Sequence, residues 1–446
     1  METLVQVAQL LLALSILVGI HEGGHMVAAK MFGMKVEKFF IGFPPTLFSF
    51  KKGETEYGLG AIPLGGFVKI SGMIDESMDK EQMAQPPQPW EFRSKPAWQR
   101  LIVMLGGIIV NVVAGVIAMI ILTYNVGDEY IPSTYVKENG VQAFKYGEQF
   151  GFQNGDKILN INGEDYERFS DVTDPAIFLD SDAYYTVERN GQQVKITVPD
   201  GALDLMSKEK TFKQEFLYPR IPFVVAYPED EEYQQNSNAK RVGILQGDKI
   251  EKVGDQYINY WDQMKPALAQ FAGGVAAVRV ERNGESFDFE VPINKDTTMG
   301  IMVGSMLSEE FIRNEYSFGE ATAKGTADAF NLVIVNARAM GKMFSGDLSA
   351  RSLSGPIGIV NLFPKAWDWN QFWYTTAFIS MILAFMNLLP IPALDGGHVM
   401  FLLYEMISGK APSDKFLENA QKVGMIILLA LMVFVFGNDI LKLFGI

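Results

Sequence analysis

The apolar residues of this 446-residue chain are concentrated in long runs near its two ends. Residues 4–20 are apolar apart from three polar residues, and residues 101–124 are apolar apart from two. A helix rises about 1.5 Å per residue, so about 20 apolar residues cross a hydrocarbon core of about 30 Å. Each run therefore predicts a membrane-spanning helix. Residues 372–389 and the shorter run 423–437 predict a third and a fourth span.

Between the second and third predicted spans the pattern changes to short alternations of apolar and polar residues, which favour β-strands. Residues 151–158 (Gly-Phe-Gln-Asn-Gly-Asp-Lys-Ile) recur in related form at 243–250, and residues 188–191 (Glu-Arg-Asn-Gly) recur at 281–284. The two segments recur at nearly the same distance along the chain, which predicts a duplicated domain of about 90 residues. The Asn-Gly pairs, flanked by alternating apolar residues, predict type I′ β-hairpins.

Charge is distributed unevenly along the chain. The insert 123–316 holds 33 acidic and 19 basic residues, so its net charge equals the −14 of the whole chain. This balance predicts an acidic, soluble, non-cytosolic domain and argues against nucleic acid as a partner. Lysine and arginine cluster in segment 30–100 and after the third span, which places those loops in the cytosol and both termini outside. The N-terminal span lacks a basic leading region, so a cleaved signal peptide is not expected.

The chain has no cysteine, which excludes disulfides, thiolate zinc ligands and a cysteine nucleophile. It has three histidines, all within two short motifs. His21 and His25 belong to His-Glu-Gly-Gly-His, which fits the H-E-x-x-H pattern: a helix places both imidazoles on one face, where they can hold zinc, and Glu22 serves as general base. The motif continues the first apolar helix. Because a charged residue at membrane depth costs on the order of 3 kcal/mol, its presence there favours function.

Catalytic zinc usually takes three protein ligands and a water molecule, and a carboxylate is a common third. The best candidate lies in residues 387–398 (Asn-Leu-Leu-Pro-Ile-Pro-Ala-Leu-Asp-Gly-Gly-His), where the prolines break the helix and irregular backbone can turn Asp395 toward the metal. Taken alone, Asp395-Gly396 is a common turn sequence. Its pairing with the histidine motif at the same membrane depth favours ligation. His398 is expected to be structural or to support a ligand.

These motifs resemble those of the site-2 protease family of intramembrane zinc metalloproteases. The resemblance implies that His21, His25 and Asp395 hold one zinc ion, that Glu22 is the catalytic base and that Asn387 contacts the substrate. The G-x-x-x-G-D-x-I pattern looks like a PDZ domain, a module that takes peptide ends onto a sheet edge. The implied fold is a polytopic α-helical membrane protein with about four transmembrane helices, a re-entrant β-hairpin, and two mostly-β PDZ domains inserted between the second and third spans.

Further stretches extend the resemblance. Residues 58–69 are similar to the family's membrane re-entrant β-loop, and residues 353–356 (Leu-Ser-Gly-Pro) match another family signature. Asn111 occupies the place of an asparagine of the family's second span, although helix packing through Gly107 and Gly115 explains that stretch nearly as well. The loop could also be a glycine-rich surface hairpin. The implied substrate contacts are Asn387, Asn111, Gly60, Ala61, Ile62, Pro63, Leu64, Gly65 and Gly66.

The predicted organisation follows the chain in eight segments. They are the first transmembrane helix (1–31), a cytosolic-side loop (32–99) with the re-entrant hairpin at about 55–70, the second transmembrane helix (100–124), PDZ domain 1 (125–221), PDZ domain 2 (222–300), a linker with an amphipathic helix (301–371), the third transmembrane helix (372–398), and a cytosolic loop with the fourth transmembrane helix (399–446).

The family resemblance implies an endopeptidase that cuts transmembrane segments of single-span proteins in regulated intramembrane proteolysis, as part of a stress response. The implied substrates are an anti-sigma factor after a first cleavage and remnant signal peptides. The implied location is the inner membrane of a bacterium, in contact with lipid, with periplasmic PDZ domains that could take peptide termini and an active site near the cytosolic side. A silent PDZ scaffold and a metal carrier are alternatives, and Glu22 argues against both because neither needs a base.

Overall fold

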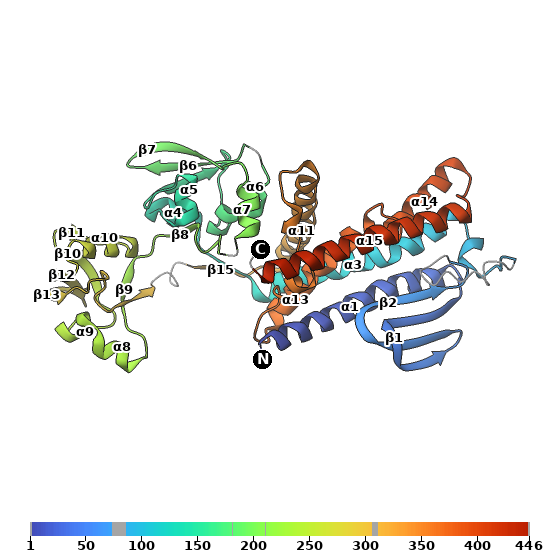
Figure 1. Ribbon diagram of the computed structural model, residues 1–446, viewed down its shortest axis with the longest axis horizontal. Coiled ribbons are helices and arrows are strands. Elements are labelled where there is room, and N and C mark those ends of the chain that lie inside the picture. Colours follow the sequence, from blue (N-terminus) through green and yellow to red (C-terminus); the bar gives the residue numbers. More distant parts are fainter. Residues whose placement is uncertain (1, 74–85, 181, 210, 306–310, 445–446) are drawn as a thin grey trace. The chain divides into compact units, whose positions relative to one another are not determined.

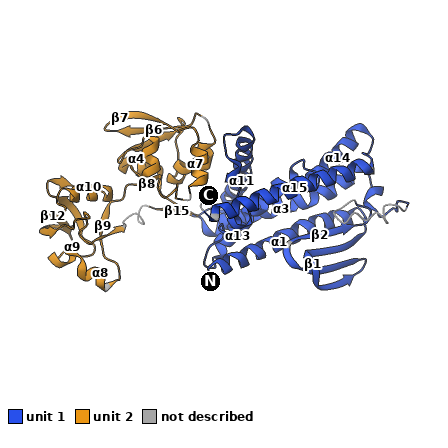
Figure 2. Cartoon of the chain, viewed as in Figure 1, with its two compact units in different colours: residues 1–127, 315–446 blue, residues 128–314 orange. Residues whose placement is uncertain are grey.

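The computed structural model describes residues 2–73, 86–180, 182–209, 211–305 and 311–444. The chain forms two compact units. Unit 1 comprises residues 1–127 and 315–446, and unit 2 comprises residues 128–314 (Figure 2). The predicted loop 32–99 and the predicted linker 301–371 each include residues outside the described ranges.

Unit 1 is mainly helical (Figure 1). Its long helices are α1 (Glu2–Met31), α3 (Ala97–Val126), α11 (Phe318–Ser345), α13 (Trp369–Leu388), α14 (Asp395–Ser408) and α15 (Asp414–Leu443). Three segments of the described chain are long and apolar enough to cross a membrane: 2–31, 97–126 and 415–442. They contain the predicted first, second and fourth spans, so the fourth is longer than the predicted run 423–437.

The third predicted span, 372–398, is not one helix. It is divided into α13 and α14, because Pro390 and Pro392 cannot continue a regular helix. α13 is also not among the helices apolar enough to cross a membrane. Several polar side chains of α13 are buried inside the protein. Thr376 donates a hydrogen bond to the Phe372 carbonyl (2.7 Å), and Ser380 donates one to the Asn111 carbonyl of α3 (2.8 Å).

Residues 36–70 form a small β-sheet beside α1 (Figure 1). Its two strands, β1 (Val36–Lys52) and β2 (Thr55–Ile70), each bend back across the sheet, so Phe40 lies opposite both Gly58 and Phe67. The sequence predicted a hairpin confined to about 55–70. That prediction was too narrow: those residues form β2 alone, and the partner strand β1 was missed because Pro44-Pro45 interrupts its alternating pattern.

Unit 2 is built from short strands and helices. Its strands are β3 (Asp128–Tyr130), β4 (Val141–Ala143), β5 (Lys157–Ile161), β6 (Tyr184–Arg189), β7 (Gln192–Thr197), β8 (Leu217–Pro219), β9 (Phe223–Ala226), β10 (Lys249–Val253), β11 (Gln256–Tyr257), β12 (Val275–Arg282), β13 (Glu285–Pro292), β14 (Met302–Ser305) and β15 (Ile312–Asn314). The larger sheets have the strand orders β5-β6-β7 and β11-β10-β12-β13. β6-β7 and β12-β13 are hairpins with two-residue loops.

Short helices connect these strands. They are α4 (Ser133–Asn139), α5 (Lys145–Phe150), α6 (Pro175–Phe178), α7 (Ala202–Lys208), α8 (Glu231–Asn236), α9 (Asn238–Val242) and α10 (Met264–Ala269). The second half of the unit has its own apolar core, which includes Phe223, Val278 and Met299. Unit 2 therefore contains at least one β-rich core that does not depend on the helices of unit 1.

Within each half of unit 2, the two kinds of repeated sequence segment contact each other. Arg189 donates two hydrogen bonds to the buried Asp156 carboxylate (2.6 and 2.7 Å) and one to the Gly151 carbonyl (2.8 Å). Arg282 makes the same three contacts with Asp248 and Gly243. The two repeated segments therefore supply the acidic and the basic partner of an ion pair that occurs once in each half of the unit.

Both predicted type I′ turns are confirmed. Asn190 and Gly191 have φ values of 52° and 78°, and Asn283 and Gly284 have values of 54° and 84°. A type I′ turn needs positive φ at both central residues, which asparagine and glycine tolerate best.

The Leu-Ser-Gly-Pro segment is anchored by the last span. Its proline begins α12 (Pro356–Val360), whose first backbone N–H groups have no partner within the helix. The Asp439 carboxylate of α15 accepts hydrogen bonds from the N–H groups of Gly355 (2.9 Å), Ile357 (2.9 Å) and Gly358 (3.2 Å). Asp439 is 4% exposed. A buried carboxylate in an apolar helix is thereby satisfied by the start of a second helix.

Candidate metal centre

The two N-terminal histidines lie on one uninterrupted helix, α1. Their spacing of four residues puts both imidazoles on the same face, as the sequence predicts. The two Nε2 atoms are 3.2 Å apart and the rings meet edge to face, with centroids 4.8 Å apart. His25 is 6% exposed, so the pair is shielded from bulk solvent.

The turn between α13 and α14 brings a carboxylate to this face. α13 ends at Leu388, and Asp395 is the first residue of α14. Within the turn, Ala393 has a φ of 86°, a left-handed conformation that residues other than glycine rarely adopt. Such strain persists only where the surrounding structure imposes it, and it is concentrated at functional sites.

Glycines pack tightly around this turn. A Cβ atom added to Gly396 would lie 2.3 Å from the Leu389 carbonyl oxygen, and one added to Gly424 of α15 would lie 1.5 Å from the Pro392 carbonyl oxygen. Neither distance is sterically possible. Glycine is therefore required on both sides of the turn, and the packing fixes where Asp395 begins its helix.

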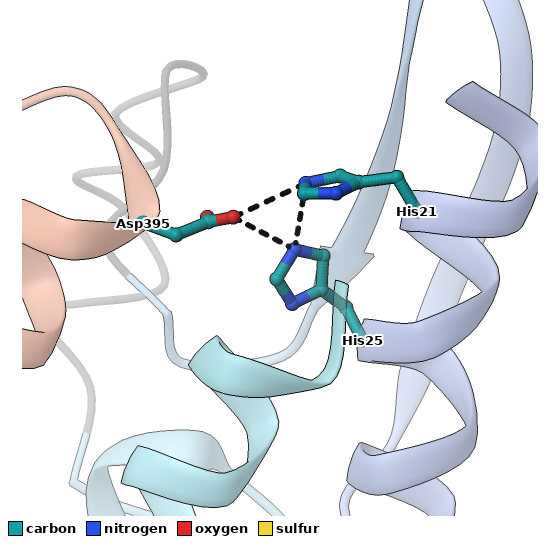
Figure 3. Close-up of side chains that lie close together, drawn as sticks. All are labelled: His21, His25 and Asp395. Carbon is teal, nitrogen blue, oxygen red and sulfur yellow. Dashed lines mark hydrogen bonds and ion pairs between the residues drawn. The ribbon is translucent and has the colours of Figure 1, made fainter. Parts of the chain in front are cut away.

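The Asp395 carboxylate meets both imidazoles (Figure 3). Its Oδ2 atom lies 3.1 Å from His21 Nε2 and 3.4 Å from His25 Nε2. This oxygen is shielded from solvent and makes no hydrogen bond of good geometry to the described residues. A buried carboxylate oxygen without a hydrogen bond is costly unless a cation satisfies it.

The three atoms have the spacing that a tetrahedral metal requires. Zinc bonds to nitrogen and oxygen of about 2.0–2.1 Å, at tetrahedral angles, separate neighbouring ligand atoms by about 3.3 Å. The separations here are 3.1, 3.2 and 3.4 Å. His21, His25 and Asp395 are also the metal-capable group found among the described residues. The donor set of two imidazoles and one carboxylate fits a catalytic zinc site with an open fourth position.

α3 forms one wall of this centre. His25 Nδ1 donates a hydrogen bond to the Val103 carbonyl (2.8 Å), which leaves its Nε2 lone pair free for a metal. A Cβ atom on Gly107 would lie 2.5 Å from His25 Nε2 and 2.7 Å from the ring of His21. Sequence reasoning gave Gly107 only a role in helix packing, and a backbone carbonyl such as that of Val103 leaves no trace in the sequence.

Glu22 lies beside the metal centre, between the two histidines in sequence. Its carboxylate lies near the backbone of Val68 on β2 and is close enough to His21, His25 and Asp395 for electrostatic interaction. A strand of the small sheet thus lies beside the predicted base. Val68 was not singled out from the sequence, because a main-chain contact leaves no motif.

The other predicted site residues fall into separate groups. Asn387 is half-buried in the last turn of α13, and residues 60–66 all belong to β2. The side chain of Leu64 is not described. Asn111 is only 1% exposed and has its amide against His21. The structure therefore brings Asn111 to a proposed ligand, where the sequence had suggested a substrate contact.

His398 lies one helical turn beyond Asp395 but does not belong to the ligand cluster. It lines a cavity of about 260 Å³ together with Arg93, Arg100 and Glu405. Arg100 and Glu405 form an ion pair there. Among the described residues, His398 thus lies outside the group of side chains that could hold a metal ion.

Comparison with known proteins identifies the family. Residues 9–431 match the model of peptidase family M50, which covers most of the chain and both parts of the metal centre. The chain belongs to peptidase family M50. It is 29% identical to the regulator of sigma E protease of Haemophilus influenzae, over 97% of this chain and 98% of that protein.

Other relatives are similar over the full length. This M50 peptidase is 30% identical to a putative zinc metalloprotease of Pasteurella multocida and 27% identical to the regulator of sigma-E protease RseP of Escherichia coli, in both cases over 98% of each chain. The chain is therefore a zinc metalloprotease and, with its three apolar helices, a membrane protein.

Proposed function

We propose that this protein is an intramembrane endopeptidase that uses a single zinc ion to hydrolyse peptide bonds within transmembrane segments. The observation that carries the proposal is the meeting of His21, His25 and Asp395, whose ligand atoms lie within 4.8 Å of one another. Two of these residues belong to a helix long and apolar enough to span a membrane. Hydrolytic chemistry at that depth requires substrates that are themselves in the membrane.

The roles of the residues follow from their positions. His21, His25 and Asp395 would hold the zinc ion, which would supply Lewis-acid chemistry for activating water near neutral pH and for polarising the scissile carbonyl. Glu22 accepts the proton of the attacking water and delivers it to the leaving amine. The backbone of Val68 on β2 lies beside the Glu22 carboxylate. No covalent intermediate is needed.

The substrate must unwind before it can be cut, because a helix in lipid hides its peptide bonds and each broken backbone hydrogen bond costs several kcal/mol there. We assign this task to β2, which contains Gly60, Ala61, Ile62, Pro63, Leu64, Gly65 and Gly66. Its 66–70 segment pairs with β1 on one side and passes Glu22 at Val68. An added substrate strand would regain hydrogen bonds there. Asn387 would hold the substrate backbone from the end of α13.

The proposal extends to the membrane topology, the domains of unit 2 and the class of substrate. α1, α3, α13 and α15 would form four spans of a bacterial inner membrane, with the active site near the cytosolic side and in contact with lipid. Unit 2 would comprise two PDZ domains in the periplasm, bounded near 125–221 and 222–300. They would take peptide termini or admit only substrates already trimmed by a first protease. An anti-sigma factor and remnant signal peptides are the substrate classes we propose.

The test uses the full-length protein in detergent, with a single-span membrane substrate. Glu22→Gln should retain zinc and lose cleavage, because the ligands remain while the base is gone. Glu2→Gln is the matched control, since Glu2 is exposed at the start of the same helix. His21→Ala should lose zinc. Cleavage that survives Glu22→Gln would refute the proposed mechanism.

The Glu22→Gln variant also separates the alternatives when zinc transport into vesicles is measured beside cleavage. A metal carrier would move zinc across vesicles with Glu22→Gln as well as with the wild type, and a scaffold would leave membrane substrates uncut in both. In cells, truncated membrane stubs that accumulate in the Glu22→Gln strain would identify the natural substrates.

A further inference from the structure

We propose that Asn111 is a positioning residue that accepts a hydrogen bond from His21 Nδ1–H and so keeps the His21 Nε2 lone pair directed at the metal. The inference rests on the proposed function, because it takes His21 as a zinc ligand. It replaces the substrate contact that the sequence had suggested for Asn111.

The argument begins with an unsatisfied atom. Asn111 lies on α3 and is 1% exposed, and its Nδ2 atom is 3.2 Å from His21 Nδ1. Its Oδ1 atom is buried and has no hydrogen-bond partner among the described residues. A buried amide oxygen that has lost water and gained no donor is unfavourable. The side chain is thus satisfied on one side only.

A half-turn of the amide would give Oδ1 a donor. The oxygen and nitrogen of an asparagine side chain are nearly equal in shape, and their assignment follows from the hydrogen-bond network. With Nδ2 toward His21, Nδ1 accepts the hydrogen bond and the ring proton must sit on Nε2, where it blocks metal binding. With Oδ1 toward His21, Nδ1 carries the proton, Oδ1 gains its donor, and Nε2 is free to face Asp395 and His25.

The second ligand is oriented in the same way. His25 Nδ1 donates to the Val103 carbonyl at 2.8 Å, and Val103 precedes Asn111 on the same helix. α3 thus supplies an acceptor to each imidazole, one from its backbone and one from a side chain. Metal-binding histidines usually have such a partner on the second ring nitrogen, because it fixes the tautomer and the ring orientation.

The position of Asn111 is itself held from a third helix. Ser380 of α13 donates a hydrogen bond to the Asn111 carbonyl at 2.8 Å. Packing alone does not account for an asparagine here, because the close approach of α3 to α13 is made at Gly115, where a Cβ would lie 2.8 Å from Met381. A polar side chain buried at this depth requires a partner, and His21 is the partner that the structure offers.

The experiment measures zinc affinity, which does not depend on turnover. Full-length protein in detergent is titrated with a competing chelator. Asn111→Leu removes the acceptor while keeping the branched shape and the number of heavy atoms, and it should weaken zinc binding by about 10- to 100-fold. Asn111→Asp keeps an acceptor and should bind zinc within a few-fold of the wild type. Asn336→Leu, on α11 and away from the centre, should bind as the wild type does.

Two results of this titration would contradict the positioning role. If Asn111→Leu binds zinc as tightly as the wild type, or if Asn111→Asp is as weak as Asn111→Leu, the positioning role is wrong. Should Asn111→Leu fail to fold, Asn111→Ala, which adds no bulk, replaces it with the same expectation. The wild type and His21→Ala test the proposed function separately: equal zinc binding by these two would refute the site itself, whatever Asn111 does.

Discussion

Gly24 and Gly106 bring the backbones of α1 and α3 into direct contact. A Cβ atom on Gly24 would lie 2.3 Å from the Gly106 carbonyl oxygen, and one on Gly106 would lie 2.7 Å from the Gly24 carbonyl oxygen. Small residues at a helix crossing allow this approach, which is a common way for membrane helices to associate. The crossing lies next to His25, so it sets the distance between the proposed metal ligands and the α3 wall.

The two glycines of the histidine motif should differ sharply in their tolerance of alanine. Gly24→Ala must push α1 away from α3, and overpacking of this kind costs about 1–3 kcal/mol. It should lower thermal stability in detergent and reduce zinc content, because His25 is drawn away from Val103. Gly23→Ala is the matched control, since a Cβ there meets nothing within 4 Å. Equal stability and zinc content in the two variants would contradict this account.

Each half of unit 2 should depend on its own arginine. Arg189→Ala leaves Asp156, whose side chain is 1% exposed, without its ion-pair partner, and such a loss costs roughly 3 kcal/mol. Amide hydrogen exchange in the full-length protein should show faster exchange in β6 and β7 and little change in β12 and β13. Arg282→Ala should give the reverse pattern. Equal effects of both variants on both hairpins would show that the halves unfold together.

Loss of the Asp439 carboxylate should destabilise the link between α15 and the Leu-Ser-Gly-Pro segment. Asp439→Ala leaves three N–H groups without an acceptor, at about 1–3 kcal/mol for each that stays buried. The full-length protein should melt at a lower temperature in detergent. Asp347→Ala is the control, because its ion pair with Lys342 is exposed and such pairs contribute little. An unchanged melting temperature for Asp439→Ala would refute the anchoring role.

Unit 2 should lose stability at alkaline pH. Burial raises the pKa of Tyr227 to about 12, and burial also raises the pKa values of Tyr166 and Tyr185. The folded protein holds these protons while an unfolded tyrosine, with a pKa near 10, has released them, so unfolding releases protons. The stabilising contribution is complete below pH 10 and is lost as the pH rises toward 12. Urea unfolding followed by near-UV circular dichroism at several alkaline pH values measures this loss, and Tyr227→Phe should reduce its slope.

The sequence predicted those parts of the site that depend on local spacing. His21 and His25 are four residues apart on a helix, and that spacing alone fixes them on one face. Asp395 was found because prolines before it break a helix at the same predicted membrane depth. The type I′ turns were predicted because Asn-Gly has few other favourable conformations at such positions.

The remaining features depend on contacts between distant segments. β1 was missed because its proline pair hides the strand pattern and its partner is known only from the fold. Val68 and Val103 contribute backbone atoms, which any residue could supply. Asp439 lies beyond the predicted fourth span, and its three N–H partners are more than 80 positions earlier. None of these relationships has a fixed spacing in the sequence.

The separation of the proposed zinc ligands along the chain has a consequence for biosynthesis. His21 and His25 leave the ribosome early, whereas Asp395 follows only after most of the polypeptide has been translated. At roughly 5–20 residues per second, the nascent chain spends tens of seconds with two of the proposed ligands and without the third. On the proposed function, the metal centre is therefore incomplete during that interval, and hydrolysis can begin only after Asp395 has been added.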